Sequence, residues 1–331
     1  MKNVIIFGAT GNTGSYLSLY AKEFLKDKGF NIIAVGRKKT DFFSKYGIKY
    51  YSVDITNKNN FSILPKEDIH SVILLAAQLP AFMSDFDNSK YITTNTLGAL
   101  NVLEYCKEVK ADRILYSQTF FDVFLSVNQK EPIKPNIPRN FMYTGDHAIY
   151  VISKNAAVDL IEHYHQEYGL KNFIFRLPNI YKYVENKFFY LDGIKKQRLL
   201  TVLIDKAINS EPIEIWGDSQ YKKDMVYIAD YCQMLCKAII ANKDTGIYNV
   251  GTGTPITLEE QIKTIVKVFS PKDNPSKITY RPDKKGGFGV CMDISNAKSD
   301  LGYEPQYDCE KLFEAYKEEM KLNRFHDLFY K

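Results

Sequence analysis

The chain has 331 residues, of which 45% are hydrophobic, and this length and composition suit one large hydrophobic core with a smaller one beside it. The net charge of +5 comes from 44 basic and 39 acidic residues scattered along the sequence, so neither nucleic acid nor a membrane surface is an expected partner. No apolar stretch reaches the ~20 residues that a bilayer span requires, and we expect a cytoplasmic protein of two domains.

The five cysteines show no paired spacing that would indicate a disulfide framework, which fits a reducing cytoplasm. Cys232 and Cys236 are four residues apart and would share one face of a helix. Because no His or further Cys stands at ligand spacing, we predict core packing for this pair and no metal site.

Short apolar runs alternate with longer helical patterns through the first 180 residues, which is the rhythm of βαβ units. The runs are too continuously apolar for half-exposed antiparallel strands, and they predict a doubly wound parallel sheet of the α/β class, covered on both faces. The predicted strands are Val4 to Phe7, Ile32 to Val35, Tyr50 to Val53, Val72 to Leu75, Ile114 to Tyr116 and Phe173 to Leu177. The predicted crossover helices are Thr13 to Lys26, Asn95 to Glu108 and Asp146 to Tyr168.

The pattern loosens from about Tyr181, where aromatic residues alternate with Gly, Pro and Asp, and a smaller α/β domain is expected to begin there. A helix over Ile228 to Ile240 and a strand over Ile247 to Val250 are expected to return to the first sheet. The predicted first domain is therefore 1–180 with a returning segment of about 224–251, and the second is 181–223 with 252–331.

A glycine-rich turn follows the first predicted strand and leads directly into a helix, the context of a Rossmann dinucleotide-binding turn. Glycine is needed here because a side chain would keep the backbone away from the pyrophosphate, whose charge is met by amide groups at the helix start. The predicted cofactor-binding residues of the turn are Gly8, Thr10, Gly11, Asn12, Thr13 and Gly14.

The second predicted strand leads to Arg37 and Lys38, where NAD-selective folds carry an acidic residue for the ribose 2′-hydroxyl. Two cations suit a 2′-phosphate instead, because Arg37 offers a planar fork and Lys38 a point charge. The sequence therefore favours NADP over NAD.

Tyr150 and Lys154 are four residues apart and lie on one face of a predicted helix. A tyrosine ionises near pH ~10, so acid/base work near neutrality requires its pKa to fall by roughly three units, which a nearby ammonium and the nicotinamide cation favour. The same spacing recurs at Tyr183/Lys187 and Tyr280/Lys284, but in the irregular second half, where solvent-facing pairs are expected.

The order of these motifs resembles that of the extended short-chain dehydrogenases, the NAD(P)-dependent nucleotide-sugar epimerase/dehydratase family, over nearly the entire chain. In that family an Asp-hydrophobic pair after the third strand covers the adenine, and two small residues lie beside the cofactor. The resemblance places these roles on Asp54-Ile55 and Ala76-Ala77, and it implies that Asn95 braces the site.

The resemblance also implies the catalytic residues. Ser117-Gln118-Thr119 stands at the end of the fifth strand, where the family has its catalytic Ser or Thr. Thr119 would hydrogen-bond the reacting oxygen, and Ser117 is the reserve candidate and a substrate contact. Tyr150 would be the acid/base, while Lys154 would bind the nicotinamide ribose and lower the pKa of the tyrosine.

Matches in the second half separate this family from shorter dehydrogenases that have no sugar-nucleotide domain. Asn179 is similar to an Asn that reaches the sugar diphosphate. Lys223 stands where the family usually offers an arginine, and a lysine loses the bidentate fork. Arg281 resembles a second diphosphate ligand, although a surface turn explains it equally well.

The chain departs from the family pattern next to the catalytic strand. Val123-Phe124 replaces the usual Tyr-Gly, and Phe120-Phe121 stands where the 4,6-dehydratases carry an Asp-Glu pair. Eliminating water needs a proton donor and a base at neighbouring sugar carbons, so dehydration is the least expected of the family's reactions. The proline-containing stretch 129–139 is expected to be an irregular loop that either shapes the pocket or only joins strand to helix.

These observations leave three hypotheses. The first is a nucleotide-sugar epimerase acting at carbon 4, and the second is an NADPH-dependent reductase of a nucleotide 4-keto sugar. The third is a cofactor-binding regulator without catalysis, since a fold alone does not prove activity. A nucleotide sugar is the expected partner, and a homodimer is compatible with the sequence.

Overall fold

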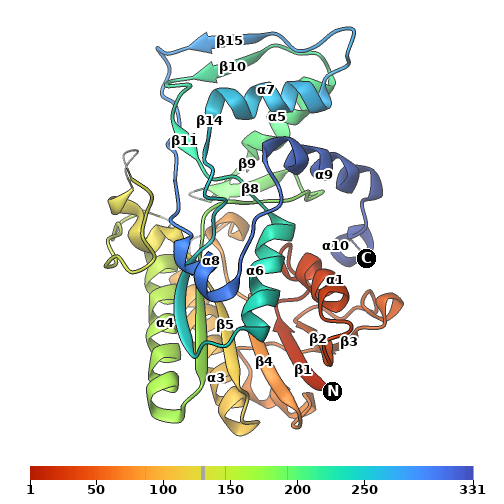
Figure 1. Ribbon diagram of the computed structural model, residues 1–331, viewed down its shortest axis with the longest axis vertical. Helices are drawn as coiled ribbons and strands as arrows, with labels where there is room; N and C mark the ends of the chain where they lie inside the picture. Colours follow the sequence, from red (N-terminus) through yellow and green to blue (C-terminus); the bar gives the residue numbers. More distant parts are fainter. Residues whose placement is uncertain (86, 128–130, 146, 192, 331) are drawn as a thin grey trace.

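The computed structural model describes residues 1–85, 87–127, 131–145, 147–191 and 193–330. Its centre is a seven-stranded sheet in the order β13-β6-β5-β4-β1-β2-β3, in which every neighbouring pair is parallel (Figure 1). This confirms the predicted Rossmann-type α/β class. The strand order reverses between β1 and β4, so the crevice at the carboxyl ends of these strands is the expected ligand site.

The sheet forms because its strands are almost wholly apolar and buried. In β1 the four residues Val4 to Phe7 are completely inaccessible, and β2, β4, β5 and β6 show similar runs. The strands are β1 (Lys2–Phe7), β2 (Phe30–Gly36), β3 (Lys49–Ser52), β4 (Ile69–Leu74), β5 (Arg113–Thr119), β6 (Lys171–Leu177) and β13 (Thr245–Asn249).

Two helical layers cover the sheet. α3 and α4 pack on one face against side chains such as Phe7 and Ile114, and α1 and α6 pack on the other against Ile6 and Leu115. Alternate residues of each strand therefore serve opposite cores. The helices of this part are α1 (Gly14–Phe24), α2 (Asn88–Tyr91), α3 (Gly98–Glu108), α4 (Ala148–Tyr168) and α6 (Ile228–Ile240), with short turns η1 (Ser44–Tyr46), η2 (Lys58–Ile63), η3 (Pro80–Phe82), η4 (Ile92–Leu97) and η5 (Phe120–Ser126).

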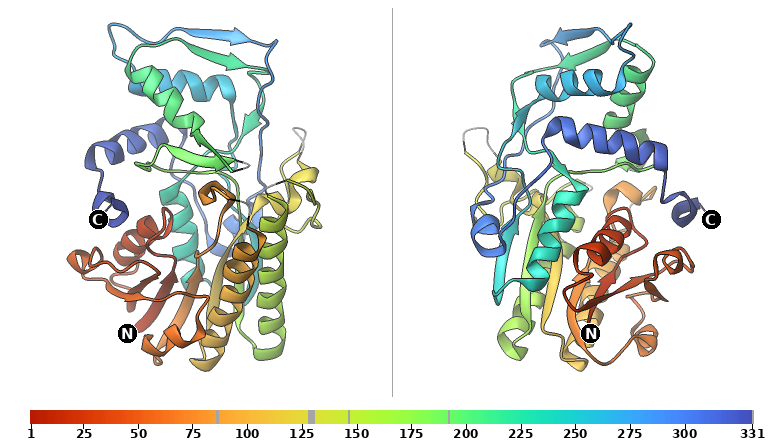
Figure 2. Two further views of the ribbon diagram at one scale, coloured as in Figure 1. Left: turned by 180° about the vertical axis from the view of Figure 1, so that it is seen from behind. Right: turned by 45° about the vertical axis from the view of Figure 1, so that its right-hand side comes forward.

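The second body lies beyond the carboxyl ends of the sheet and consists of helices with small two-stranded pairings (Figures 1 and 2). α7 packs against α5 and α9 in its centre. Its elements are β7 (Ile180–Tyr181), β8 (Phe188–Leu191), β9 (Ile194–Gln197), α5 (Leu199–Ile208), β10 (Ile213–Trp216), β11 (Lys222–Lys223), β12 (Val226–Tyr227), β14 (Ile256–Thr257), α7 (Leu258–Phe269), β15 (Ile278–Arg281) and α9 (Cys309–Leu322).

The chain crosses between the two bodies several times. α6 and β13 return to the sheet, and two later helices also lie against the first body. α8 (Ser295–Leu301) packs on α6 and β13, and α10 (His326–Tyr330) lies beside α1, close to the cofactor domain (Figure 1). The stretch 252–331 is thus shared between the two bodies. Among the described residues no helix is long and apolar enough to cross a membrane.

The helix predicted from Asn95 begins earlier and irregularly. Residues 92–97 form a π-helical turn, η4, before regular α3 starts at Gly98. Gly98 faces Ile55, and a Cβ at this position would come within 2.7 Å of the Ile55 Cδ1 atom. Helical turns of this kind occur mostly at functional sites.

Candidate active site

The glycine-rich turn makes two close backbone approaches. Gly8 has a φ of +90°, and a Cβ on it would come within 2.6 Å of the Ala76 amide nitrogen. A Cβ on Gly14 would come within 2.1 Å of the Gly8 carbonyl oxygen. Because no side chain fits at either position, the turn brings its backbone against the carboxyl ends of β1 and β4.

The amino end of α1 faces this turn. Its N-cap, Thr13, is helical in conformation, and within the described residues no side chain caps the helix start. No acidic residue lies in the first turn either. Free amide groups and the helix dipole at such an end attract an anion, and the pyrophosphate of a dinucleotide is such an anion.

The end of β2 carries the cations that the sequence singled out. Arg37 is exposed, whereas the Lys38 Nζ atom donates to the carbonyl oxygen of Leu328 in α10 at 2.8 Å. The Tyr50 hydroxyl donates to the backbone oxygens of Gly36 and Lys38 and so fixes the turn between them. Arg37 is therefore the more available of the two cations.

The segment after β3 is fixed by its own hydrogen bonds. The Asp54 carboxylate accepts from both the amide and the hydroxyl of Thr56, at 3.0 and 2.8 Å. The Ile55 carbonyl accepts from the Asn101 side chain at 2.8 Å, which ties this segment to α3. Ala76 and Ala77 follow β4, half-buried beside the glycine turn.

Thr119, Tyr150 and Lys154 meet at the carboxyl end of β5. Thr119 is the last residue of β5, and its side chain forms a hydrogen bond with the hydroxyl of Tyr150 in α4. Lys154 lies one turn further along α4, with its Nζ atom 4.1 Å from the centre of the Tyr116 ring. All three predicted catalytic residues are at least 92% buried.

Burial is the largest influence on the pKa values of Tyr150 and Lys154. It raises the pKa of Tyr150, an effect that the hydrogen bond from Thr119 opposes. It also lowers the pKa of Lys154 to about 7. Burial therefore favours the neutral forms of both side chains.

Asn95 connects the catalytic helix to the cofactor side of the site. Its amide oxygen accepts from the Gln78 amide at 2.7 Å, and its amide nitrogen donates to the Ser153 hydroxyl at 3.0 Å. Ser153 lies between Tyr150 and Lys154 and donates to the Tyr150 carbonyl at 2.7 Å. These contacts fit the bracing role that the resemblance implies for Asn95.

Ser117 occupies a different place from Thr119. Its hydroxyl is 2.5 Å from that of Tyr231 in α6, on the face of the sheet opposite α4. The structure therefore brings Thr119, and not the reserve candidate Ser117, to the catalytic helix. Gln118, which the sequence analysis did not single out, accepts from the Thr119 amide at 2.8 Å and donates to Asn155 at 2.8 Å.

The three predicted diphosphate ligands lie in different surroundings. Asn179 is exposed in the loop after β6. Lys223 is half-buried in β11, and burial lowers its pKa to about 8. Arg281, at the end of β15, binds the Asp283 carboxylate at 2.9 and 2.8 Å and lies 3.5 Å from Glu214.

The other two Tyr/Lys pairs do not form comparable sites. The Tyr280 hydroxyl donates to Glu259 at 2.6 Å on a partly exposed strand. Lys187 binds Asp205 at 2.7 Å, away from Tyr183. Of the three pairs, only Tyr150 and Lys154 share a helix.

The sequence model of the NAD dependent epimerase/dehydratase family matches residues 4–251. The chain belongs to this family. It is an enzyme family whose members depend on NAD or NADP and act on nucleotide sugars. The predicted membership is confirmed.

Known members of the family match almost the whole chain. It is 23% identical to the dTDP-glucose 4,6-dehydratase of Haemophilus influenzae, over 94% of this chain and 95% of the relative. The structure of UDP-glucose 4-epimerase from Thermotoga maritima, determined with UDP-glucose, superposes with a TM-score of 0.75 and 22% sequence identity. The superposition covers 97% of this chain and 99% of that protein. The structure of UDP-glucuronic acid 4-epimerase from Bacillus cereus, in complex with NAD, superposes with a TM-score of 0.70 and 19% sequence identity. This superposition covers 96% of this chain and 97% of that protein.

Aromatic side chains fill the place where the dehydratases of this family carry their acids. Phe121 lies 4.3 Å from the His147 ring, and Phe124 lies 5.1 Å from the ring of Phe288 in the second body. The His147 ring is in turn 6.4 Å from that of Tyr150. Among the described residues, aromatic rings therefore border Tyr150 on this side.

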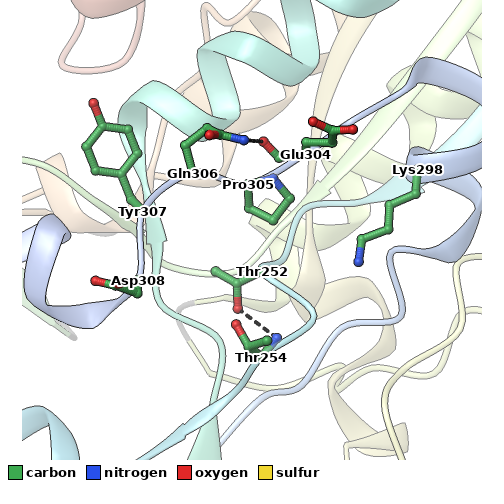
Figure 3. A pocket seen from close by; sticks show the side chains of 8 residues that line it. All are labelled: Thr252, Thr254, Lys298, Glu304, Pro305, Gln306, Tyr307 and Asp308. Carbon is green, nitrogen blue, oxygen red and sulfur yellow. Dashed lines mark hydrogen bonds between the residues drawn. The ribbon is translucent and has the colours of Figure 1, made fainter.

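A separate hollow of about 420 Å³ opens beside α8, and Figure 3 shows its lining. The described residues that line it are Thr252, Thr254, Lys298, Glu304, Pro305, Gln306, Tyr307 and Asp308. None of these is a predicted site residue. The hollow therefore does not mark the candidate active site of this family member.

Proposed function

We propose that this protein is a nucleotide-sugar 4-epimerase in which Tyr150 is the acid/base. The observation that carries the proposal is the hydrogen bond between Thr119 and Tyr150, one helical turn from Lys154, at the carboxyl end of β5 in a member of the epimerase/dehydratase family. The aromatic residues Phe120 and Phe121 in place of acids argue against dehydration.

The cofactor supplies hydride chemistry, and the residues manage protons and position. As a phenolate, the Tyr150 oxygen would take the proton of the sugar hydroxyl when the carbon is oxidised, and as a phenol it would return this proton when the ketone is reduced. The Thr119 hydroxyl bonds the same sugar oxygen. Lys154 in its charged form favours the tyrosinate and binds the nicotinamide ribose.

The proposal requires the protonation of this pair to change when ligands bind. Burial is the main cause that raises the pKa of Tyr150, and it lowers that of Lys154. Ribose hydroxyls that accept hydrogen bonds from Lys154 would stabilise its charge, and that charge would then lower the pKa of Tyr150. The active ionisation state therefore belongs to the loaded enzyme.

We further propose NADP as the preferred cofactor. Arg37 is exposed at the end of β2, and the carboxylate of nearby Asp54 is engaged by Thr56. A guanidinium in this position suits the 2′-phosphate of NADP. The similar UDP-glucuronic acid 4-epimerase structure from Bacillus cereus, in contrast, is a complex with NAD.

For the sugar diphosphate we propose Lys223 as the main cation. It is half-buried in the second body, and desolvation by its surroundings strengthens its attraction for an anion. Asn179 is exposed and can contribute an amide. Arg281 would have to leave Asp283 and Glu214 before it could bind a phosphate.

The alternative is an NADPH-dependent reductase of a nucleotide 4-keto sugar, which the cations at the end of β2 favour because cells keep the NADP pool reduced. An epimerase regenerates its cofactor in each cycle, whereas a reductase consumes it. The test is incubation of the purified enzyme with UDP-, GDP-, CDP- and dTDP-hexoses without added cofactor. Interconversion of 4-epimers is expected. In a parallel incubation with added NADPH and a nucleotide 4-keto sugar, stoichiometric loss of NADPH, together with no interconversion in the first test, would establish the reductase.

A further inference from the structure

Arg176, at the end of β6, lies at the centre of a buried polar network. Its Nε and Nη2 atoms donate to both carboxylate oxygens of Asp122, at 2.9, 3.2 and 3.0 Å. Its Nη1 atom donates to the Pro135 carbonyl at 2.9 Å and to the Asn249 side chain at 3.2 Å. Arg176 and Asp122 are 3% and 2% exposed, so the pair is isolated from water.

On one side this network supports the turn that begins at Thr119. Asp122 lies in the first turn of η5, whose N-cap is Thr119, and the Thr119 Oγ1 atom accepts from the Phe121 amide at 3.3 Å. The Asp122 carbonyl accepts from the Asn140 amide at 2.8 Å, and the Asn140 carbonyl accepts from Leu125 at 3.0 Å. The guanidinium thus fixes both η5 and the returning loop.

On the other side the network reaches the second body. The Asn249 amide nitrogen donates to the Ile133 carbonyl at 2.6 Å and to the Asp293 carbonyl at 3.2 Å. The neighbouring Met292 amide donates to Asp224 at 2.6 Å. Asp224 directly follows Lys223, the proposed diphosphate cation. These hydrogen bonds, together with the peptide bonds between Met292 and Asp293 and between Lys223 and Asp224, connect η5 with the segment of the proposed diphosphate cation.

We propose that Asp122 and Arg176 are positioning residues, which hold Thr119 at a set distance and direction from Tyr150 and from the diphosphate end. The inference rests on the proposed function. A buried ion pair adds little to stability compared with apolar residues of similar size, but it fixes direction strictly. Small displacements of a catalytic group have large effects on rate, because the reacting atoms must be aligned.

The test compares Asp122→Glu, Asp122→Asn and Arg176→Lys with wild type. Asp122→Glu keeps the charge and lengthens the side chain, and Arg176→Lys keeps the charge and removes the fork. The matched control is Asp159→Asn, which removes an exposed ion pair between α4 and Arg139 of the same loop (Arg139 Nη1 to Asp159 Oδ2, 2.9 Å). We measure kcat, KM for the nucleotide sugar, the cofactor Kd, thermal unfolding, and hydrogen exchange of residues 120–126.

The expected result is a fall in kcat of about tenfold or more in Asp122→Glu and Arg176→Lys, with KM and Kd within about twofold and faster exchange in 120–126. Asp159→Asn should match wild type. A folded Asp122→Asn or Asp122→Glu enzyme with wild-type kcat would overturn the inference, as would a loss of kcat that only follows the folded fraction.

The two proposals fail separately. If wild type interconverts no nucleotide sugar and reduces none, the proposed function is wrong, whatever the variants do. Hydrogen exchange then decides the positioning role alone: exchange of 120–126 that is about tenfold faster in Arg176→Lys than in Asp159→Asn supports it, and unchanged exchange refutes it.

Discussion

Lys154 is a buried lysine, and its contribution to the free energy of unfolding depends on pH. Its pKa is about 7 in the folded protein, whereas that of a free lysine is 10.5. Above pH 10.5 both states are neutral, but as the pH falls towards 7 the unfolded chain takes up a proton that the folded protein does not. The folded state is therefore penalised increasingly down to pH 7, by on the order of 5 kcal/mol, and by this constant amount below pH 7.

We predict that Lys154→Met stabilises the cofactor-free protein at about pH 6.5 and that this gain disappears near pH ~10. Urea unfolding at several pH values measures it. Lys196→Met, at an exposed position in β9, is the control and should change little. A gain that does not depend on pH would show that packing of the methionine, and not removal of the charge, is responsible.

Tyr150 is expected to matter for turnover and little for binding. Tyr150→Phe removes one proton-transferring oxygen and almost no packing volume. Turnover should fall by roughly a hundredfold or more, while cofactor affinity stays near wild type. Steady-state rates and a fluorescence titration of the cofactor measure the two effects. Retention of more than about a tenth of the wild-type rate would mean that another group carries the proton.

At the residue scale the sequence could predict single positions only where a motif limits them. The glycine spacing limits the predicted cofactor turn in this way, and the Tyr150/Lys154 interval within a predicted helix limits the predicted catalytic pair. The choice between Ser117 and Thr119 depends on the partner that the fold brings to each hydroxyl, and for Ser117 this partner is Tyr231, which is 114 residues away. Nothing local in the sequence indicates the contact of Asp122, because its partner Arg176 lies 54 residues away, in β6.

At the scale of elements, η4 and α4 are joined by Asn95, which makes three hydrogen bonds at 3% exposure. Replacing it with alanine would leave the Gln78 amide and the Ser153 hydroxyl without this partner. We predict that Asn95→Ala lowers the free energy of unfolding by about 2–4 kcal/mol. Chemical denaturation measures this loss.

The matched control for Asn95 is Asn101→Ala, in the next part of the same helical run, because Asn101 makes a single hydrogen bond, to the Ile55 carbonyl. Its loss should be about 1 kcal/mol. Equal losses in the two variants would contradict the view that Asn95 joins two elements.

Elements with strong patterns were predicted well, and the irregular ones were not. The helix expected over 228–240 is observed with those bounds, because its apolar residues face the sheet. The predicted strand Ile114 to Tyr116 extends to Thr119, since polar Gln118 and Thr119 are buried in β5 by hydrogen bonds that the sequence does not reveal. The predicted start of α4 at Asp146 lies outside the described residues.

At the scale of the whole molecule, the end of the chain returns to the cofactor domain. Phe325 packs 4.6 Å from the Tyr16 ring and 5.8 Å from that of Phe42, and Leu328 is 1% exposed. The sequence contains no periodic signal for this contact, because α10 is a single short turn of helix after α9. Long-range packing of this kind follows from the tertiary fold and not from local pattern.

This return changes what the two cations at the end of β2 do. Lys38 binds the carbonyl of Leu328, where the carbonyl end of a helix favours a cation, and Arg37 remains exposed. We therefore predict that Arg37→Ala weakens NADPH binding by about 10- to 100-fold and leaves NADH binding unchanged, because only the 2′-phosphate uses the guanidinium.

Lys38→Ala should weaken NADPH binding less and should also lower thermal stability by freeing α10. Lys39→Ala, at the exposed neighbouring lysine, is the control and should alter neither. Fluorescence titration of both cofactors, with thermal unfolding of each variant, measures these effects. Equal NADPH and NADH affinities in wild type, or an Arg37→Ala enzyme that binds NADPH as wild type does, would show that the end of β2 does not select the cofactor.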